Sequence, residues 1–372
     1  MSKLIRIGIV GAGFGSSFYF HLHPSCHVEA VCAQFENERV KLAETYKCKK
    51  TYTSLHEVLK DPSVDAVALF TPVPLHAEHS ISALNAGKHV LCAVPAGMTI
   101  EECQKVKHAV LRSGKTYMMA ETSVFRQSTI SARNFYERGF FGKIIAAESD
   151  YHHPGLEHYF FDQKGQPTWR HGLPPMKYSS HCISFLLGVT GGYLTSVSSQ
   201  GWGDADPVLK NNGYNNTFWN ETALFRTHEN TPFKVSVSWR GALLPCERCV
   251  WYGERMSFHS GTTSGSDPFI VKSSKRQGAD DGGFVTSDPI LEPYIQRLWW
   301  QSDMLPEALR IDSGHGGSHT FLTHEFIDSI ACDRKPKIGI EEAIAYTVPG
   351  IVAHQSSIRN GETLTIPTYG SL

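Results

Sequence analysis

The sequence predicts an α/β protein of two domains, the first built on a parallel sheet and the second an α+β domain with an open, mainly antiparallel sheet. Over the first part of the chain, short apolar runs alternate with amphipathic stretches, a pattern typical of parallel strands joined by helices. After residue 122, longer strand-like runs follow one another with few helical segments between them. A length of 372 residues suits two domains. We therefore expect one domain over residues 1–122 and a second over residues 123–372.

The strands of the first domain are expected at five apolar runs. The stretch 101–114 between two of them has the spacing of an amphipathic helix. The runs are LIRIGIV at 4–10, VEAVCA at 28–33, DAVALF at 65–70, KHVLCAV at 88–94 and KTYMMA at 115–120.

The second domain begins with a helix-like segment at 128–139 and continues with strand-like runs. A stretch at 261–286, rich in Gly, Ser and Asp, is expected to be a surface loop or a lid over a cleft. Two helical patterns and a short strand follow it, at 319–333, 341–361 and 363–367. The strand-like runs lie at 143–153, 193–202, 217–227, 233–241, 246–253 and 255–260.

Composition limits the classes of partner. The net charge of −1 and the lack of a long basic stripe predict no general attraction to nucleic acid or to membranes. The start of the chain enters an apolar strand without a signal peptide or a spanning segment, so a cytoplasmic location is expected. Nine scattered cysteines, an odd number, indicate free buried thiols rather than disulfides.

A glycine-rich turn, GAGFGS at 11–16, directly follows the first expected strand. Gly11 would make the tight turn, and Gly13 would let backbone amides approach a pyrophosphate at the start of the next helix. Ser16 replaces the third glycine of the usual pattern, and Phe14 and Gly15 lie between them. In this context the turn predicts binding of a nicotinamide dinucleotide.

The acidic ligand expected for the adenosine ribose is absent, because the second strand ends at Gln34. Glu36, one turn further on, is a possible substitute. No arginine follows the strand immediately, which favours NAD over NADP. Glu121, after the fifth run, is expected either to contact the nicotinamide or substrate or to cap a helix.

A second polar cluster lies in PPMKYSSHCISFLLG at 174–188, where two prolines precede an apolar stripe that Gly188 would end. Lys177, Tyr178 and His181 are spaced to reach one patch of a helix, which is either a catalytic site or a solvated helix start. A cation near the first turn opposes the helix dipole by about 0.3–1 kcal/mol. Lys177 is therefore unfavourably placed unless an anionic group meets it, and a simply exposed lysine is the alternative.

A segment around the third and fourth apolar runs carries a recognisable set of residues. These are Thr71-Pro72, His76, Ala83-Leu84 and AGKHV at 86–90. With them the chain resembles, over nearly its whole length, the Gfo/Idh/MocA family of nicotinamide-dependent sugar oxidoreductases. The resemblance implies a Rossmann domain followed by an α+β domain, with the active site between them. It also implies cofactor contacts from Thr71, Pro72, His76 and Pro95.

Two positions depart from the family pattern and direct the comparison to a subgroup. Val94 stands where these dehydrogenases carry lysine, and Lys177 stands where they carry an aspartate four residues before His181. The chain is similar instead to the NAD-dependent α-N-acetylgalactosaminidases of the same superfamily. The matching motifs are Val94-Pro95, Tyr178-x-x-His181, Tyr151-x-His153 and Gly-His-Gly-Gly at 314–317.

This resemblance implies a glycoside hydrolase that keeps its NAD tightly bound. A sugar C3 hydroxyl is oxidised to a ketone, the C2 proton is removed, the aglycone is eliminated, water adds, and the ketone is reduced again. His181 is expected to handle the C3 hydroxyl and Tyr151 to be the C2 base, since Tyr151 and His153 share one face of a strand. Tyr178 would share that work or bind the sugar.

The cation at Lys177 has two possible uses, to lower a tyrosine pKa or to bind an anionic group of the substrate. Trp169 and Arg170, just upstream, make a carboxylated or sulfonated sugar conceivable. Two other functions remain open: a net NAD(P)-dependent 3-oxidoreductase acting on sugars or glycosides, and a catalytically idle dinucleotide-binding sensor.

No metal site is expected, because Cys246-x-x-Cys249 has no second such pair and its two residues would point to opposite faces of a strand. A homodimer or homotetramer is expected instead. Aromatic residues on the long strands, such as Trp219, Phe225 and Trp239, would need cover on the second face of the sheet.

Overall fold

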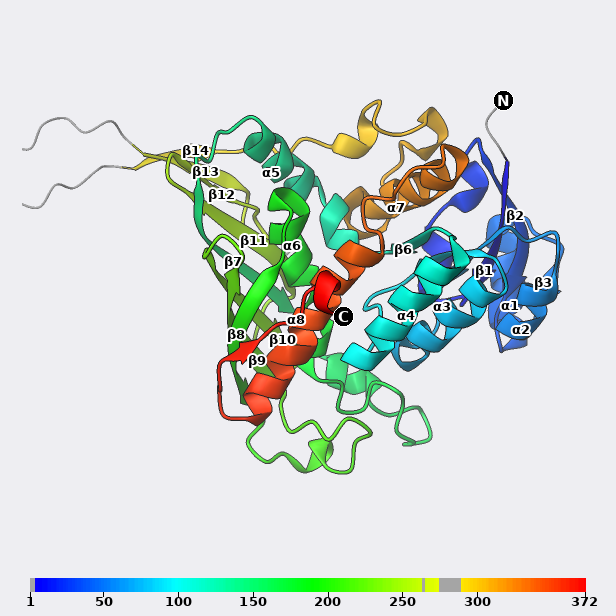
Figure 1. The fold of residues 1–372 in the computed structure, drawn as a ribbon, viewed down its shortest axis with the longest axis horizontal. Helices are drawn as coiled ribbons and strands as arrows, with labels where there is room; N and C mark the ends of the chain where they lie inside the picture. The colour runs from blue at the N-terminus through cyan, green and yellow to red at the C-terminus, as the bar shows by residue number, and fades with distance from the viewer. Residues whose placement is uncertain (1–3, 263–264, 274–288) are drawn as a thin grey trace, which may run out of the picture. The chain divides into compact units, whose positions relative to one another are not determined.

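The computed structural model describes residues 4–262, 265–273 and 289–372, which form two compact units (Figure 1). The first unit comprises Met1–Gln127, Leu298–Val352 and Pro367–Leu372, and the second comprises Ser128–Arg297 and Ala353–Ile366. We expected one boundary between the units, after residue 122. Instead, the chain passes from one unit to the other several times. One cause is packing, since the Phe321 ring stacks on the Phe125 ring at 5.6 Å and keeps a late helix in the first unit.

The sheet of the first unit is parallel throughout, with the strand order β3-β2-β1-β4-β5-β6 (Figure 1). The five apolar runs form five of its strands, and β3 is a short edge strand that the sequence analysis did not identify. The strands are β1 (Ile5–Val10), β2 (Cys26–Cys32), β3 (Thr51–Tyr52), β4 (Ala66–Leu69), β5 (His89–Cys92) and β6 (Tyr117–Met119).

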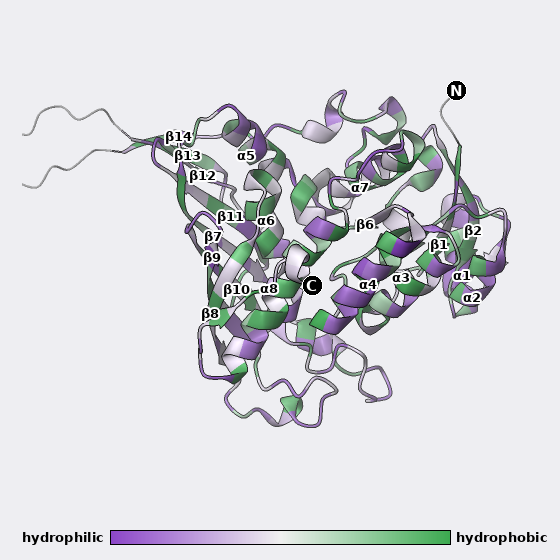
Figure 2. Cartoon of the chain, viewed as in Figure 1, coloured by the Kyte–Doolittle hydropathy of each residue, from purple (hydrophilic) through white to green (hydrophobic). Residues whose placement is uncertain are grey.

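The helices of this unit begin and end at ordinary capping residues. In α4 the Thr99 side chain accepts the Glu102 amide at the start, and Gly114 ends the helix with φ +62°. Hydrophilic and hydrophobic stretches share the α4 ribbon in Figure 2, as expected of a helix that covers a sheet. The helices are α1 (Glu36–Tyr46), α2 (Leu55–Lys60), α3 (His76–Asn85), α4 (Ile100–Ser113), α7 (Gly314–Ala331) and α8 (Ile340–Ile358), whose last residues belong to the second unit.

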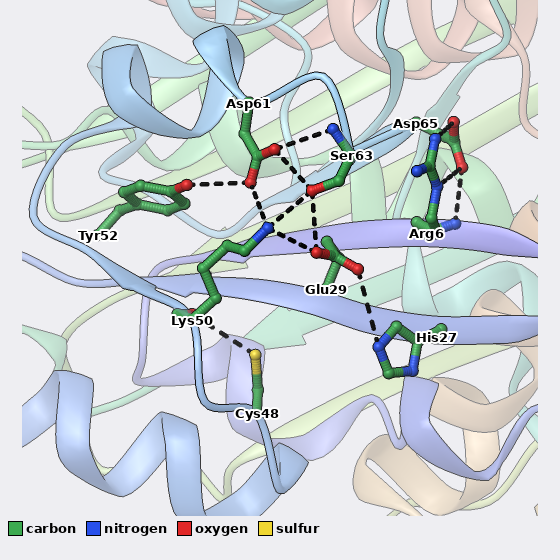
Figure 3. A network of polar contacts seen from close by, with 9 residues as sticks. All are labelled: Arg6, His27, Glu29, Cys48, Lys50, Tyr52, Asp61, Ser63 and Asp65. Atoms are coloured by element: carbon green, nitrogen blue, oxygen red, sulfur yellow. Dashed lines mark hydrogen bonds and ion pairs between the residues drawn. The ribbon is translucent and has the colours of Figure 1, made fainter.

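A polar network ties β2, β3 and the segment after α2 together (Figure 3). The Lys50 ammonium donates to Glu29 at 2.6 Å, to Asp61 at 2.9 Å and to Ser63 at 2.7 Å. Burial alone would raise the pKa of Asp61, but hydrogen bonds from Ser63, Lys50 and Tyr52 outweigh it and hold this pKa below its usual range. The network therefore stabilises the edge of the sheet with an ionised carboxylate.

The sheet of the second unit has the order β14-β13-β12-β11-β7-β10-β9-β8-β15 (Figure 1). It is antiparallel except where β7 pairs with β10, so the expected mainly antiparallel sheet is confirmed. The strands are β7 (Ile144–His152), β8 (Leu194–Trp202), β9 (Asn220–Thr227), β10 (Pro232–Ser238), β11 (Cys246–Gly253), β12 (Met256–His259), β13 (Phe269–Lys272), β14 (Ile290–Pro293) and β15 (Leu364–Thr365). The helices α5 (Gln127–Glu137) and α6 (Ser180–Thr190) lie on one face of this sheet (Figure 1).

Two expectations about this unit need correction. Trp219, Phe225 and Trp239 are buried within the unit, so they do not require cover from a second subunit. The face of the sheet that carries Glu148 and Asp150 is polar, because these residues pair with Lys234 at 3.7 Å and with Arg248 at 2.6 Å. The second expectation concerned a loop or lid at 261–286. Residues 263–264 and 274–286 of this segment lie outside the described residues, and Phe269–Lys272 forms strand β13 instead of a loop.

The nine cysteines are free, as expected, and all except Cys332 are buried. Among the residues that the structure describes, no helix has the length and apolar character needed to cross a membrane.

Candidate functional site

The candidate residues fall into two groups, one in each unit. In the first unit, Gly11 adopts φ +103°, and a methyl group there would overlap the Phe70 carbonyl oxygen, so only glycine fits. At Gly15 an added Cβ would lie 2.7 Å from the Phe70 ring, and the Gly15 carbonyl accepts the Tyr46 hydroxyl at 2.5 Å. No heavy atom lies within 4 Å of an added Cβ at Gly13, which leaves space where a pyrophosphate is expected.

The segment after this turn is not the long helix that the sequence predicts. Two 3₁₀ turns, Phe14–Ser17 and Phe20–Leu22, take its place, and the Ser16 hydroxyl donates to the Gly13 carbonyl at 3.0 Å. Phe18 is buried and packs at 4.4 Å against the ring of His319. A regular helix is replaced here by a compact aromatic cluster, so the amides near Gly13 belong to a single short turn.

The Gly-His-Gly-Gly motif lies beside the glycine turn, a contact that sequence spacing alone could not reveal. His319 Nδ1 lies 3.0 Å from the Ser17 carbonyl oxygen, and His315 Nδ1 lies 2.8 Å from His319 Nε2. Burial lowers the pKa of His319 to about 3, so its ring is neutral and its single proton lies on Nδ1, donated to Ser17. His315 must then donate to His319. The Phe14 ring meets both imidazoles edge-on, at 5.5 and 5.0 Å.

The two residues considered for the adenosine ribose follow β2 and lie at the surface, and their contact with the ribose stays a prediction. Gln34 and Glu36 are exposed, and Glu36 is the first residue of α1. The Arg39 guanidinium, in the first turn of α1, donates to the Ala33 carbonyl at 3.1 Å. The sequence analysis looked for an arginine near the adenosine ribose only at the positions immediately after the strand. It therefore did not consider Arg39.

The loops after β4 and β5 are joined by a histidine. His76, 1% exposed, has Nε2 at 2.8 Å from the Thr71 carbonyl and Nδ1 at 2.9 Å from the Pro95 carbonyl. Pro72 precedes the 3₁₀ turn Val73–Leu75 that leads into α3. We therefore interpret His76 as the support of the two loops whose cofactor contacts the resemblance implies.

Glu121 follows β6 and is fully buried. Its Oε1 accepts the Ser123 backbone N–H at 3.0 Å and caps the 3₁₀ turn Thr122–Phe125. The capping alternative is thus confirmed, and a contact with the nicotinamide stays a prediction.

In the second unit, the predicted catalytic rings come together. Tyr151, near the end of β7, lies 4.8 Å from the His181 ring and 6.0 Å from the Tyr178 ring, measured between ring centroids. Tyr178 lies 5.4 Å from His181. Trp239, after β10, packs at 6.0 Å against both tyrosines, and sequence analysis had treated it only as an aromatic of the sheet. We call these four residues the tyrosine–histidine cluster.

The two histidines after Tyr151 lie where the alternation of a strand places them. The exposed His153 has its ring 6.2 Å from that of Tyr151, on the same face. Burial is the main cause that lowers the pKa of His152; Asp150 of the polar face opposes it, and Arg248 of the same face lowers the pKa further. His152 therefore points away from the cluster, as expected.

Lys177 is not on the helix that carries His181. It belongs to the 3₁₀ turn Pro175–Tyr178, and α6 begins at Ser180 and continues to Thr190, past the expected end at Gly188. Gly191 provides the C-cap instead, so Gly188 simply remains inside the helix. Lys177 therefore precedes the first turn of that helix instead of belonging to it, and its expected opposition to the helix dipole stays a prediction.

Arg170 is the cation that the structure places among tyrosines. Its guanidinium lies 4.1 Å from the centre of the Trp169 ring, and no carboxylate among the described residues pairs with it. Burial lowers the pKa of Arg170, and neighbouring tyrosine hydroxyls partly oppose this effect. Those tyrosines are Tyr178, Tyr159, Tyr214 and Tyr151.

No group of three or more His, Cys, Asp or Glu side chains suited to a metal ion occurs in the described part of the chain. The tyrosine–histidine cluster and Arg170 bring phenol, imidazole and guanidinium groups to the second unit. These can accept and return protons and hold the hydroxyl groups of a small polar molecule.

One family model matches the N-terminal part of the chain, and curated relatives match nearly its whole length. Residues 5–121 match the Gfo/Idh/MocA model, described as an oxidoreductase family with an NAD-binding Rossmann fold. An α-N-acetylgalactosaminidase of Shewanella oneidensis is 27% identical over 99% of this chain and 85% of its own length. A glycosyl hydrolase family 109 protein of Shewanella sp. (strain W3-18-1) is 22% identical over 98% of this chain and 85% of its own length.

Solved structures share the fold. Levoglucosan dehydrogenase in complex with NADH has a TM-score of 0.78 at 16% identity and covers 98% of this chain and 99% of its own. An apo scyllo-inositol dehydrogenase from Lactobacillus casei has a TM-score of 0.70 at 19% identity, with the same coverage. Residues 5–121 therefore form a Rossmann domain that matches the Gfo/Idh/MocA oxidoreductase model, and this match together with the curated relatives identifies the chain as an NAD-dependent enzyme.

Proposed function

We propose that this enzyme is a redox-neutral glycoside hydrolase. The observation that carries the proposal is the tyrosine–histidine cluster, in which two phenols and an imidazole lie within ring-contact distance of each other. Sequence similarity to an α-N-acetylgalactosaminidase supports the same reaction class. Bound NAD would supply a hydride acceptor that becomes the donor when the cycle closes.

The residues of the cluster would divide the proton transfers. His181 takes the proton of the C3 hydroxyl as that carbon is oxidised, and returns it at the end. Tyr151 removes the C2 proton, which the C3 ketone has made acidic, and the aglycone leaves from C1 by elimination. Tyr178 binds a sugar hydroxyl or shares the work of the base, and the exposed His153 stands on the same face of β7 as Tyr151.

In this scheme Arg170, instead of Lys177, is the cation that lowers the pKa of a tyrosine or binds an anionic group of the substrate. A phenol is a base only as its phenolate, and a nearby cation favours the phenolate. Arg170 acts electrostatically on Tyr178 and Tyr151 and has no carboxylate partner among the residues described. An anionic substituent of the sugar is the alternative partner for this guanidinium, with Trp169 beside it.

A panel of chromogenic glycosides, neutral and anionic, tests the function while nicotinamide absorbance is followed. We expect release of the aglycone without net NADH. Stoichiometric NADH would show a net 3-oxidoreductase instead, and neither signal across the panel would indicate an idle dinucleotide-binding sensor.

The cofactor is expected to copurify, because a redox-neutral cycle regenerates NAD⁺ and never needs to exchange it. Denatured, extracted protein should therefore show nicotinamide absorbance, and added NAD should raise the activity little. Assembly as a homodimer or homotetramer and a cytoplasmic location stay predictions. Sedimentation of a monomer at micromolar concentration would contradict the assembly.

A further inference from the structure

A buried carboxylate lies behind the turn that carries Tyr178. Glu221 is the second residue of β9 and is 1% exposed. Its Oε2 accepts the Met176 backbone N–H at 2.8 Å, and its Oε1 lies 3.0 Å from His354 Nδ1 in the last part of α8. His354 is 3% exposed, and no lysine or arginine of the described chain pairs with Glu221.

The pattern of contacts assigns the proton of this pair. A carboxylate only accepts hydrogen bonds, so His354 Nδ1 must donate to Glu221. His354 Nε2 is buried and has no hydrogen-bond partner. A buried carboxylate is thus held by two N–H donors, one of which belongs to the turn.

The Met176 amide is a group that its own turn cannot satisfy. The 3₁₀ turn Pro175–Tyr178 begins with a proline, and the first amides of any helical turn lack partners within it. A second anchor lies just before the turn, where Trp239 Nε1 donates to the Leu173 carbonyl at 2.8 Å. The turn is therefore fastened to β9 and to the end of β10 by side chains, and α6 follows it directly.

We propose that Glu221 and His354 are positioning residues that hold the turn so that Tyr178 and His181 face Tyr151. Tyr151 belongs to β7 and is placed by the ladder of the sheet, whereas Tyr178 depends on the turn. The catalytic consequence rests on the proposed function. A displacement of about 1 Å in such a group can cost about 100-fold in rate.

Three variants separate positioning from charge and from stability. In Glu221→Gln, the amide oxygen can still accept the Met176 N–H, so the anchor of the turn is kept, whereas the amide nitrogen can donate to His354 Nδ1 only if the ring proton moves to the buried Nε2. Glu221→Ala removes both hydrogen bonds. The control is Thr231→Val, which removes a buried hydrogen bond to the Ile144 carbonyl (3.3 Å) at the far end of the β9–β10 hairpin.

The first readout does not need activity. Hydrogen–deuterium exchange of the segment 174–182 should become faster in Glu221→Ala and stay at the wild-type rate in Glu221→Gln and Thr231→Val. Unchanged exchange in Glu221→Ala would overturn the proposal. If Glu221→Ala fails to fold, His354→Ala, which removes only one donor from the carboxylate, should show the same change to a smaller degree, and wild-type exchange there would overturn it equally.

The second readout is kinetic. In Glu221→Ala, kcat should fall by about 10- to 100-fold with KM little changed, and NADH formation in a single turnover should slow with it because His181 is displaced. Glu221→Gln should recover most of the wild-type rate. Loss of activity in Glu221→Gln with normal exchange would assign Glu221 an electrostatic role and overturn positioning. If wild type releases no aglycone while the exchange pattern holds, the proposed function fails and the anchoring of the turn stands.

Discussion

The glycine turn of the first unit occupies the consecutive residues 11–16, whereas the tyrosine–histidine cluster of the second unit combines β7, a 3₁₀ turn, α6 and the residue after β10. The turn is fixed by backbone conformation, as φ +103° at Gly11 shows. The cluster is fixed by tertiary packing and by side-chain hydrogen bonds to the backbone. Substitutions in the turn should therefore act on folding and binding, and substitutions in the cluster on separate chemical steps.

The largest effects are expected in the cluster. His181→Ala should suppress both NADH formation and exchange of the C2 hydrogen with deuterated water, because removal of the C2 proton requires the ketone. Tyr151→Phe should still form enzyme-bound NADH in a single turnover, yet lose C2 exchange and aglycone release. Loss of a general base costs about 10²- to 10⁴-fold in rate. Absorbance and mass spectrometry of the sugar measure the two stages.

A control for these variants lies on the same strand. His152 points to the polar face of the sheet, so His152→Gln should keep both signals. Wild-type C2 exchange in Tyr151→Phe would transfer the role of base to Tyr178 or His153.

Two alanine substitutions in the turn should behave differently. Gly11→Ala places a Cβ against the Phe70 carbonyl at a positive φ, which should destabilise the fold by about 1–3 kcal/mol. Gly13→Ala meets no protein atom within 4 Å and should leave the melting temperature unchanged while weakening NAD⁺ binding. Thermal unfolding without cofactor, together with calorimetric titration, separates the two. Normal NAD⁺ affinity in Gly13→Ala would contradict the expected place of the pyrophosphate.

The next effect concerns the cation near the tyrosines. Removing the positive charge in Arg170→Met should raise the pKa of a tyrosine base, so the rising limb of the pH–rate profile should move to higher pH. Lys177→Met should leave that limb in place. If Arg170 instead holds an anionic substituent, KM should rise for anionic glycosides alone. If the rising limb moved in Lys177→Met but not in Arg170→Met, Lys177 would be the cation that lowers the pKa of the tyrosine.

The smallest effect on catalysis is expected away from both regions, in the polar network around Asp61, where a substitution should act on stability alone. Because the pKa of Asp61 is held below its usual value in the folded protein, its ionised form adds stability above the unfolded pKa of about 4, and this stability is lost as pH falls through the lower folded value. Asp61→Asn should lower stability at pH 7 by about 1–3 kcal/mol, and less in acid. Glu292→Gln, in an exposed pair with Lys272, is the matched control and should change little.

The parallel sheet and the glycine turn could be predicted from the sequence because both depend on local patterns: apolar runs with helical connections, and glycines at a strand end. In the cluster, the spacing of Tyr178 and His181 predicted a shared patch and the resemblance added the role of Tyr151, whereas Trp239 was not predicted to join them. The place of Lys177 was wrong because the helix was assumed to begin at the prolines, although a separate 3₁₀ turn precedes α6.

Other features had no signal in the sequence. Glu221 looks like an ordinary inward residue of a strand, and its contacts with Met176 and His354 join segments far apart in the chain. The place of Arg170 among tyrosines likewise depends on how distant loops fold. The contact of His319 with the glycine turn could not be predicted either, although the Gly-His-Gly-Gly motif marked the loop that makes it.

Helix α8 has a consequence for how the protein is made. Its residues up to Val352 belong to the first unit and those from Ala353 to the second, which also takes in β15. During synthesis, the chain therefore supplies the last strand of the second unit and the last segment of the first only after residue 352 has been added. When only residues 5–121 have been synthesised, both units still lack segments that come later in the chain. The two units should therefore finish folding together, late in translation.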